Sequence, residues 1–207
     1  MKPDLPRSFY ARSPTLVALE LLGKIISHRT ADGKLVSGMI VETEAYLGVG
    51  DAAAHSARGI TPRTRVLFGP PGFTYVYLIY GMHYCLNIVT EKEGRAGCVL
   101  VRALEPRTGM TLPSNGPGRL TRALGITLEH NASDLLRGPL RVVKGMHDNG
   151  MHDNGMHDNG MHGNGMHGKE MRGEKFRIET SPRIGITKSA DLPLRFFIAG
   201  NSFVSRL

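Results

Sequence analysis

The chain has 207 residues, of which 41% are hydrophobic and 21% charged, and it carries a formal net charge of +8. This length allows one sizeable core, so we expect a single domain over residues 1–207. No long apolar run is present, and Pro6, Pro14 and Glu20 interrupt the N-terminal segment, so we expect neither a signal peptide nor a membrane partner. The predicted location is cytoplasmic and nucleoid-associated.

The excess of Lys and Arg favours a polyanionic partner, because phosphate contacts release condensed counterions. The clearest cluster is a basic loop in which Arg58, Arg63 and Arg65 flank Thr61, and such a loop could contact DNA. A solvated turn explains the same residues equally well.

The first half of the chain begins with a helix and a hairpin. Residues 14–22 predict the helix, because a Ser-Pro pair precedes them and a glycine follows. Strands are predicted at 24–30 and 35–47, joined by an Asp-Gly turn at 31–34.

Alternation along the second of these strands puts Glu42, Glu44 and Tyr46 on one face. Two carboxylates and a tyrosine therefore point the same way. Alternation in a later strand, 97–104, puts Arg102 among apolar neighbours, where a guanidinium requires an acidic partner.

A second hairpin is predicted from strands 74–79 and 84–90, with its turn at 80–83. Tyr80 and Met82 then lie at the tip, where large apolar side chains are left in water. An exposed apolar tip needs a partner.

Two cysteines, Cys85 and Cys98, fall inside strand-like apolar runs. Their spacing matches no metal site, so we expect reduced, buried thiols that pack in the core. We expect no cofactor.

A short helix and two strands are predicted in the second half of the chain. The loop 113–118 leads into a short helix over 119–124, whose N-terminus could hold an anion, although a plain junction is the simpler reading. Strands at 184–186 and 194–198 return the chain to the core.

A five-residue repeat separates these elements. From Met146 the chain reads MHDNG three times, then MHGNG and MHGKE. Such a polar, glycine-rich run cannot bury enough surface to order itself, so residues 145–173 predict a disordered surface insert in one domain. Its evenly spaced histidines suit no compact metal site.

The combination of residue types points to work on nucleic-acid bases. An enzyme that takes a base out of a duplex needs flat aromatic walls and a plug for the gap. Tyr46 and Tyr77 could sandwich the base, with His55 closing the pocket, while Tyr80 and Met82 could wedge into the duplex. Each tyrosine taken singly is better explained by core packing.

Hydrolysis of an N-glycosidic bond passes through an oxocarbenium-like transition state, so a carboxylate can stabilise the charge and activate water. Glu44 is the favoured base, with Glu42 as its rival on the same face, and Arg102 is its expected partner. No lysine lies in this run of motifs, which argues against Schiff-base chemistry.

Two other functions fit part of the pattern. A metal-dependent phosphodiesterase could use Glu42, Glu44, Asp51 and His55 as ligands. A non-catalytic single-strand binder needs the tyrosines and the basic loop but no carboxylate.

Together these motifs resemble the alkyladenine (3-methylpurine) DNA glycosylases over nearly the whole chain except the repeat. The segments that carry the resemblance are Glu42–Tyr46, His55, Thr61–Arg63, Tyr75–Met82, Asn87, Arg102–Pro106 and Pro193–Phe196.

The resemblance implies a mixed α/β (α+β) single domain with a curved antiparallel sheet flanked by helices. It also implies a monomer that uses no metal and excises alkylated or deaminated purines from double-stranded DNA to start base excision repair. By the same resemblance the site has three parts, which are Glu44 and Arg102 as catalytic base and partner, Tyr46, His55, Tyr77 and Asn87 around the base, and Tyr80, Met82, His83, Thr61 and Arg63 on the DNA.

The position of Asn87 is the one that in the family disfavours the exocyclic amino group of guanine. The chain departs from the family at the repeat, at Arg119, where lysine is frequent, and over residues 187–190.

Overall fold

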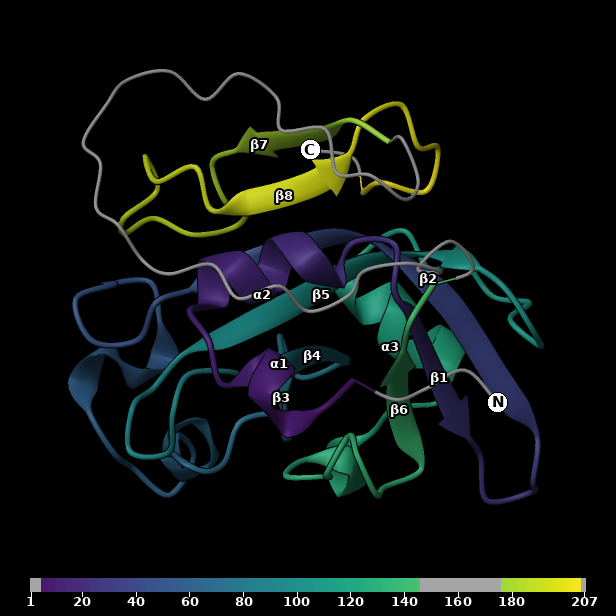
Figure 1. Ribbon diagram of the computed structural model, residues 1–207, viewed down its shortest axis with the longest axis horizontal. Helices are drawn as coiled ribbons and strands as arrows, with labels where there is room; N and C mark the ends of the chain where they lie inside the picture. Colours follow the sequence, from purple (N-terminus) through teal and green to yellow (C-terminus); the bar gives the residue numbers. More distant parts are fainter. Residues whose placement is uncertain (1–4, 146–175, 206–207) are drawn as a thin grey trace.

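The computed structural model describes residues 5–145 and 176–205 (Figure 1). The predicted insert therefore lies outside the described residues, apart from its first residue. No helix in the described part is long and apolar enough to cross a membrane.

Short helices and one antiparallel sheet make up the fold (Figure 1). The helices are α1 (Arg7–Tyr10), α2 (Pro14–Leu21) and α3 (Pro117–Leu124), with single-turn 3-10 segments η1 (His55–Arg58), η2 (Arg65–Phe68) and η3 (Leu128–His130). The strands are β1 (Ile25–Arg29), β2 (Leu35–Tyr46), β3 (Thr74–Ile79), β4 (His83–Val89), β5 (Cys98–Pro106), β6 (Leu140–Val143), β7 (Ile178–Ser181) and β8 (Arg195–Ile198).

The long strand β2 organises the sheet. The strand order is β3-β4-β5-β2-β1-β6, and β8 pairs with both β2 and β7. Along one edge β2 pairs with β5, whereas along the other it pairs first with β1 and then, at residues 42–44, with β8. The C-terminal hairpin β7–β8 therefore meets the sheet beside the two carboxylates of β2.

One face of the sheet forms the main core with α2 and α3. Val76, Leu86 and Ile88 on β3 and β4 belong to the same apolar cluster as Leu21 of α2 and Leu120 of α3, and all five are buried. Full burial of one such side chain stabilises the fold by about 1.5–3 kcal/mol. The helices therefore cover this face and leave the opposite face for polar side chains.

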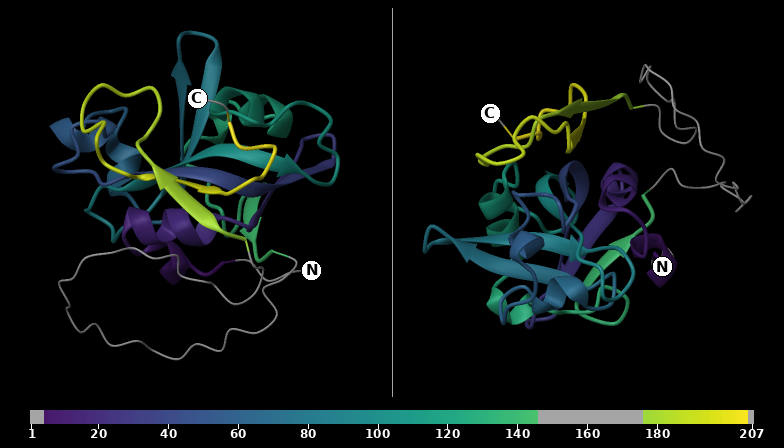
Figure 2. Two further views of the ribbon diagram at one scale, coloured as in Figure 1. Left: turned by 90° about the horizontal axis from the view of Figure 1, so that it is seen from above. Right: turned by 90° about the vertical axis from the view of Figure 1, so that its left-hand side faces the viewer.

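The hairpin β3–β4 projects from the molecule on the side opposite α1 and α2 (Figure 2). Its connection is three residues long, and Tyr80 and Gly81 both have positive φ angles, +52° and +69°. This tight reversal pairs Ile79 with His83, so His83 opens β4 and does not lie in the turn as predicted.

The curved antiparallel sheet, the helix over 14–22 and both hairpins are confirmed within two residues at their ends. The helix predicted at 119–124 begins earlier, at Pro117. The strand predicted at 184–186 is wrong, because Gly185 has a φ of +76° and the Ile184 N–H bonds a carboxylate, not a neighbouring strand.

Two glycines with the same φ of +82° allow a test of backbone packing. A Cβ on Gly48 would lie 1.7 Å from the carbonyl oxygen of Ala96, whereas a Cβ on Gly33 would meet nothing within 4 Å. We expect Gly33→Ala to lower the free energy of unfolding by about 1–2 kcal/mol, the cost of the left-handed backbone alone. Gly48→Ala should lower the free energy of unfolding, measured by urea titration, clearly more than Gly33→Ala does. An equal decrease for the two variants would contradict the clash with Ala96.

Candidate active site

The predicted site residues come together on the face of the sheet that α2 and α3 leave free. The register sets Tyr77 opposite Cys85 and Tyr46 opposite Cys98, and Leu100 faces both Glu44 and Asn87. Neighbouring strands thus carry these side chains on one face of the sheet.

A local irregularity in the β2–β5 ladder sets the direction of the Arg102 side chain relative to Glu42 and Glu44. The register shifts on both sides of Glu42, between Ile40 and Glu42 and between Glu42 and Thr43. Such bulges bend a strand and redirect side chains, and they are frequent beside active sites. Here the shifts bring Arg102 of β5 to both carboxylates of β2.

Glu44 is fully buried and has three donors. The N–H of Ile184 donates at 2.7 Å and Arg102 Nη1 lies 3.2 Å away, both on Oε1, while the Tyr46 hydroxyl donates to Oε2 at 2.9 Å. Oε2 therefore keeps acceptor capacity for a further donor.

Burial raises the pKa of Glu44 above its ordinary value, although Arg102, the Ile184 N–H and the Tyr46 hydroxyl each act to lower it. Burial and the neighbouring Glu44 also raise the pKa of Tyr46 far above its usual range. The Tyr46 hydroxyl is therefore always protonated and acts as a donor toward Glu44.

Glu42, the rival base, is more completely engaged. Its Oε1 accepts from Arg102 Nε at 2.9 Å, Arg195 Nε at 2.7 Å and the Ser205 hydroxyl at 2.8 Å, and its Oε2 accepts from the Ser205 N–H at 2.7 Å. Two of these four donors are arginines, whereas Glu44 has only Arg102 as a charged partner among the described residues. Glu42 is therefore the counter-charge of two arginines, which favours Glu44 over Glu42 as the base.

An aromatic cluster lies farther along the same face. His55 Nδ1 is 2.9 Å from the Tyr75 hydroxyl, and the rings of His55 and Tyr77 meet edge to face at 4.6 Å. Arg63 donates to the Tyr75 hydroxyl at 3.2 Å and its guanidinium lies 5.1 Å from the centre of the Tyr77 ring. Burial and Arg63 lower the pKa of His55, so the ring is neutral at physiological pH.

Asn87 is buried between two strands. Its Nδ2 donates to the Tyr75 carbonyl at 3.1 Å, and its Oδ1 accepts from the Cys98 thiol at 3.9 Å. Both cysteines are free and buried, as predicted. Asn87 therefore has a fixed orientation on the same face as Tyr77.

The hairpin tip is exposed, as predicted. Tyr80 is 81% and Met82 70% exposed, and His83 is exposed too. A left-handed backbone at a non-glycine residue costs about 1–2 kcal/mol, so neither burial nor backbone preference accounts for Tyr80. Its ring is left in solvent.

Thr61 holds the basic loop together and is exposed. Its N–H donates to Thr64 Oγ1 at 2.8 Å, and the Thr64 N–H donates back to Thr61 Oγ1 at 3.1 Å. Arg58, Arg63 and Arg65 are also exposed, and Arg63 in addition contacts Tyr75 and Tyr77.

Sequence reasoning missed two arginines and a serine. Arg183 forms a bidentate ion pair with Asp51, at 2.6 and 2.9 Å, and its guanidinium lies 4.6 Å from the centre of the Tyr46 ring. Arg195 and Ser205 bond Glu42. Arg195 had a signal, because an arginine inside the apolar run Leu-Arg-Phe-Phe requires an acid, as Arg102 does.

The ligands of the hypothetical metal site were Glu42, Glu44, Asp51 and His55. Asp51 pairs with Arg183, Glu42 with two arginines, and His55 lies near Tyr75. Burial opposes ionisation of Asp51, yet hydrogen bonds from Arg183 and from the Leu47 N–H hold its pKa below the ordinary value. Within residues 5–145 and 176–205 no three His, Cys, Asp or Glu side chains converge as a metal cluster.

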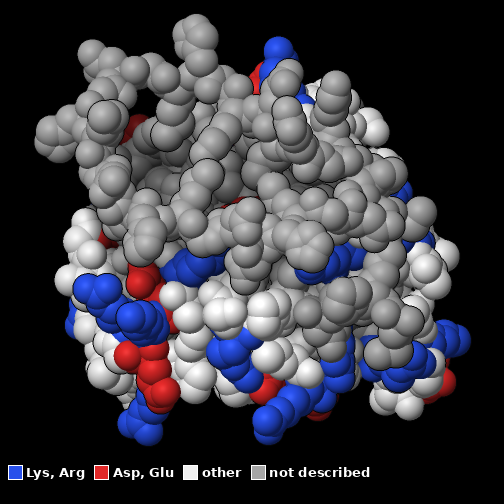
Figure 3. Space-filling view, viewed as in Figure 1, with Lys and Arg blue, Asp and Glu red and all other residues white. Residues whose placement is uncertain are grey.

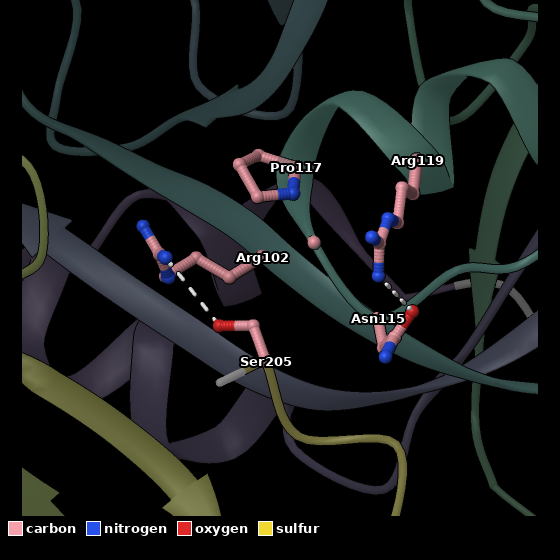
Figure 4. Close-up of a pocket in the computed structure, with 6 residues that line it drawn as sticks. Arg102, Asn115, Pro117, Arg119 and Ser205 are labelled. Carbon is pink, nitrogen blue, oxygen red and sulfur yellow. Dashed lines mark hydrogen bonds between the residues drawn. The ribbon is translucent and has the colours of Figure 1, made fainter. Parts of the chain in front are cut away.

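A pocket of about 380 Å³ opens beside Arg102 (Figure 4). Ser205 lies on one side of it, and Pro117 and Arg119, at the start of α3, lie on the other. Arg119 bonds Asn115 at 3.1 Å, and Arg102 Nη2 lies 3.4 Å from the Ser205 hydroxyl. Two guanidinium groups therefore border an opening at the charged end of the site.

The opposite face of the molecule has a different character. In Figure 3, which views the side of α1 and α2, the visible Lys and Arg side chains are interspersed with Asp and Glu. Among the described residues visible on this side, acidic groups thus lie between basic ones.

Comparison with known proteins gives a consistent result. The family model for methylpurine-DNA glycosylase (MPG) matches residues 8–202. A relative from Koribacter versatilis is 44% identical over 97% of this chain and 92% of its own length, and one from Methanoculleus marisnigri is 44% identical over 98% of both. A third, from Legionella pneumophila, is 42% identical over 98% of both, and all three are provisionally named 3-methyladenine DNA glycosylase.

The different environments of Glu42 and Glu44 predict opposite effects of one substitution on stability. A raised pKa means that the folded state binds the Glu44 proton more tightly, so this stabilisation is present at acidic pH and lost as pH rises through the folded pKa. At pH 7–8 we therefore expect Glu44→Gln to raise Tm, by about 2–4 °C for each kcal/mol. Glu42→Gln should instead lower the free energy of unfolding by about 3–5 kcal/mol, because it removes the carboxylate that two buried arginines, Arg102 and Arg195, share.

Calorimetry at pH 4.5 and pH 7.5 checks both effects. The gain for Glu44→Gln should shrink at the lower pH. A loss of stability for both variants at both pH values would contradict the assigned environments.

Proposed function

We propose, because the chain belongs to the methylpurine-DNA glycosylase family, that it removes damaged purines such as 3-methyladenine from double-stranded DNA. The reaction hydrolyses the N-glycosidic bond and leaves the sugar-phosphate backbone intact. One observation carries the proposal, which is that Glu44, Arg102 and the aromatic group Tyr46, His55 and Tyr77 share one face of the sheet.

Glu44 is the proposed base. Its Oε2 accepts only the Tyr46 hydroxyl among the described residues, so a water can donate a proton to the same oxygen and attack C1′ of the sugar. An ionised Glu44 also stabilises the positive charge that develops on the sugar as the bond to the base breaks.

Arg102 keeps this base ionised. Burial favours protonated Glu44, and the positive charge of Arg102 Nη1 at 3.2 Å works in the opposite direction. The base is active when ionised, so base release should fall as pH drops through the pKa of Glu44. The acid limb should lie above the usual carboxyl range, because the pKa of Glu44 is raised.

The aromatic group is proposed to receive the flipped base. Stacking between Tyr46 and Tyr77 selects flat, electron-poor bases, which include alkylated purines that carry positive charge. Neutral His55 has one ring N–H to donate to the base. Asn87 is held rigidly enough to discriminate against an extra amino group on normal guanine.

The hairpin tip is proposed to fill the gap left in the duplex. Tyr80 would insert between bases, Met82 and His83 would contact the minor-groove side, and Thr61 and Arg63 of the basic loop would contact the flanking backbone. We further propose that the protein acts as a monomer on nucleoid DNA, and that deaminated purines are also substrates.

A metal-dependent nuclease is the less supported alternative, because Asp51 is bound by Arg183 and Glu42 by two arginines. A non-catalytic binder does not account for a buried carboxylate beside an arginine on the aromatic face.

Glu44→Gln tests the reaction directly. The substitution removes the base but keeps the size of the side chain, so we expect release of free base from a duplex with one alkylated purine to fall about 10²–10⁴-fold. Chromatography of the released base measures it. Release by the unchanged protein should persist in EDTA, whereas strand scission abolished by EDTA would support the nuclease.

Tyr80→Ala tests the wedge. Because Tyr80 is exposed, the variant should keep the Tm of the unchanged protein within a few degrees and yet release base from duplex at least about tenfold more slowly. Leu16→Ala is the matched control, because Leu16 is 50% exposed on α2, on the opposite side of the molecule. Equal activity of both variants would contradict the role of Tyr80.

A further inference from the structure

The charged end of the site contains more groups than the reaction needs. Glu42 and Glu44 face Arg102 and Arg195, and all four are at most 6% exposed. Two carboxylates and two guanidinium groups sum to no net charge, which is the condition under which a buried ionic cluster is tolerated. The second carboxylate and the second arginine have no role in the proposed chemistry.

Arg195 is tied to Glu42 and to the C-terminal segment. Its Nε donates to Glu42 Oε1 at 2.7 Å, and its Nη1 donates to the Ser181 hydroxyl at 2.9 Å. Pairing of β8 with β2 puts Arg195 opposite Glu44 in the ladder. The arginine therefore neutralises Glu42 from the side opposite Arg102.

Ser205 closes the same cluster. Its N–H and hydroxyl bond the two oxygens of Glu42, and its hydroxyl oxygen accepts from Arg102 Nη2 at 3.4 Å. One hydroxyl can donate to Glu42 and accept from Arg102 at the same time. Glu42 and Ser205 thus hold two nitrogens of Arg102, Nε and Nη2, and leave Nη1 on Glu44.

We propose that Glu42, Arg195 and Ser205 are positioning residues that hold Arg102 on Glu44 and so set the pH range in which Glu44 works as a base. This inference rests on the proposed function of Glu44. It gives residues 176–205, the described segment after the repeat, a part in the reaction. That part does not depend on contact between this segment and DNA.

Charge balance gives the mechanism. With Arg195 present, two cations share Glu42, and Arg102 keeps its Nη1 on Glu44. Without Arg195, Arg102 is the one remaining arginine for both carboxylates, and the positive potential at Glu44 falls. Weaker positive potential favours the protonated carboxyl, so the base is lost at a higher pH.

Other charged or titratable groups near Glu44 also bear on this pH range. Among the described residues these are Arg102 on β5, Glu42 and Tyr46 on β2, Cys85 on β4 and Arg183 in the C-terminal segment. None of the substitutions proposed below alters one of these five, so a change in the pH profile reports the positioning residues.

Arg195→Met is the decisive variant, because methionine keeps much of the length of the side chain and removes the charge. We expect the acid limb of the base-release profile to move up by about one pH unit, which corresponds to roughly tenfold slower release on that limb. Arg177→Met is the matched control, since Arg177 is an exposed arginine next to β7 whose described ion pair is with Glu179. Its profile should not move.

Two further variants separate positioning from folding. Arg195→Lys keeps the charge and should return the limb toward its original pH. Ser205→Ala keeps the backbone N–H on Glu42 and should move the limb in the same direction as Arg195→Met, by less. Binding to a duplex with a stable abasic-site analogue should be unchanged in both.

The outcomes are distinct. If the unchanged protein releases no base at any pH, the proposed function fails. If it releases base, and folded Arg195→Met and Ser205→Ala lower the rate equally at every pH with the limb in place, the positioning role is wrong. Should Arg195→Met not fold, Ser205→Ala decides the question by the same criterion.

Discussion

The site depends on the cost of burying charge. Removing a carboxylate from water costs several kcal/mol, and only close opposite charges and hydrogen bonds offset that cost. In this protein two carboxylates on one strand are offset by two arginines from different strands, Arg102 and Arg195. The irregular ladder at Glu42, the pairing of β8 with β2 and the bonds of Ser205 all satisfy that one requirement.

The distribution of donors between the two carboxylates separates their roles. Glu42 accepts from four donors, two of them arginines, whereas Glu44 is buried with fewer donors and a raised pKa. A carboxylate with a raised pKa is a stronger general base than one with an ordinary pKa. The difference arises from Arg195 on β8 and from Ser205 after it, which bond Glu42. Both residues are distant from Glu42 in the sequence.

Local patterns predicted much of this arrangement. Alternation placed Glu42, Glu44 and Tyr46 on one face, and the acid required by Arg102 was found there. Both predictions depend on residues two apart on a strand, where geometry leaves few choices.

Other features could not be predicted locally, because they depend on contacts distant in sequence. Arg183 reaches Asp51 across 132 positions and Ser205 reaches Glu42 across 163. The strand expected at 184–186 failed for the same reason, since the Ile184 N–H bonds Glu44 and leaves no ladder to form. Nothing in an apolar Ile-Gly-Ile run reveals a distant carboxylate.

The conformation of Tyr80 has a consequence for engineering. Its backbone is one that glycine or asparagine would adopt at lower cost, so screening for heat resistance alone would favour replacing the ring. Under the proposed role of Tyr80 in the duplex, screening for survival of DNA alkylation would retain it. At this hairpin tip, selection for thermal stability and selection for repair activity would therefore favour different residues at the same position.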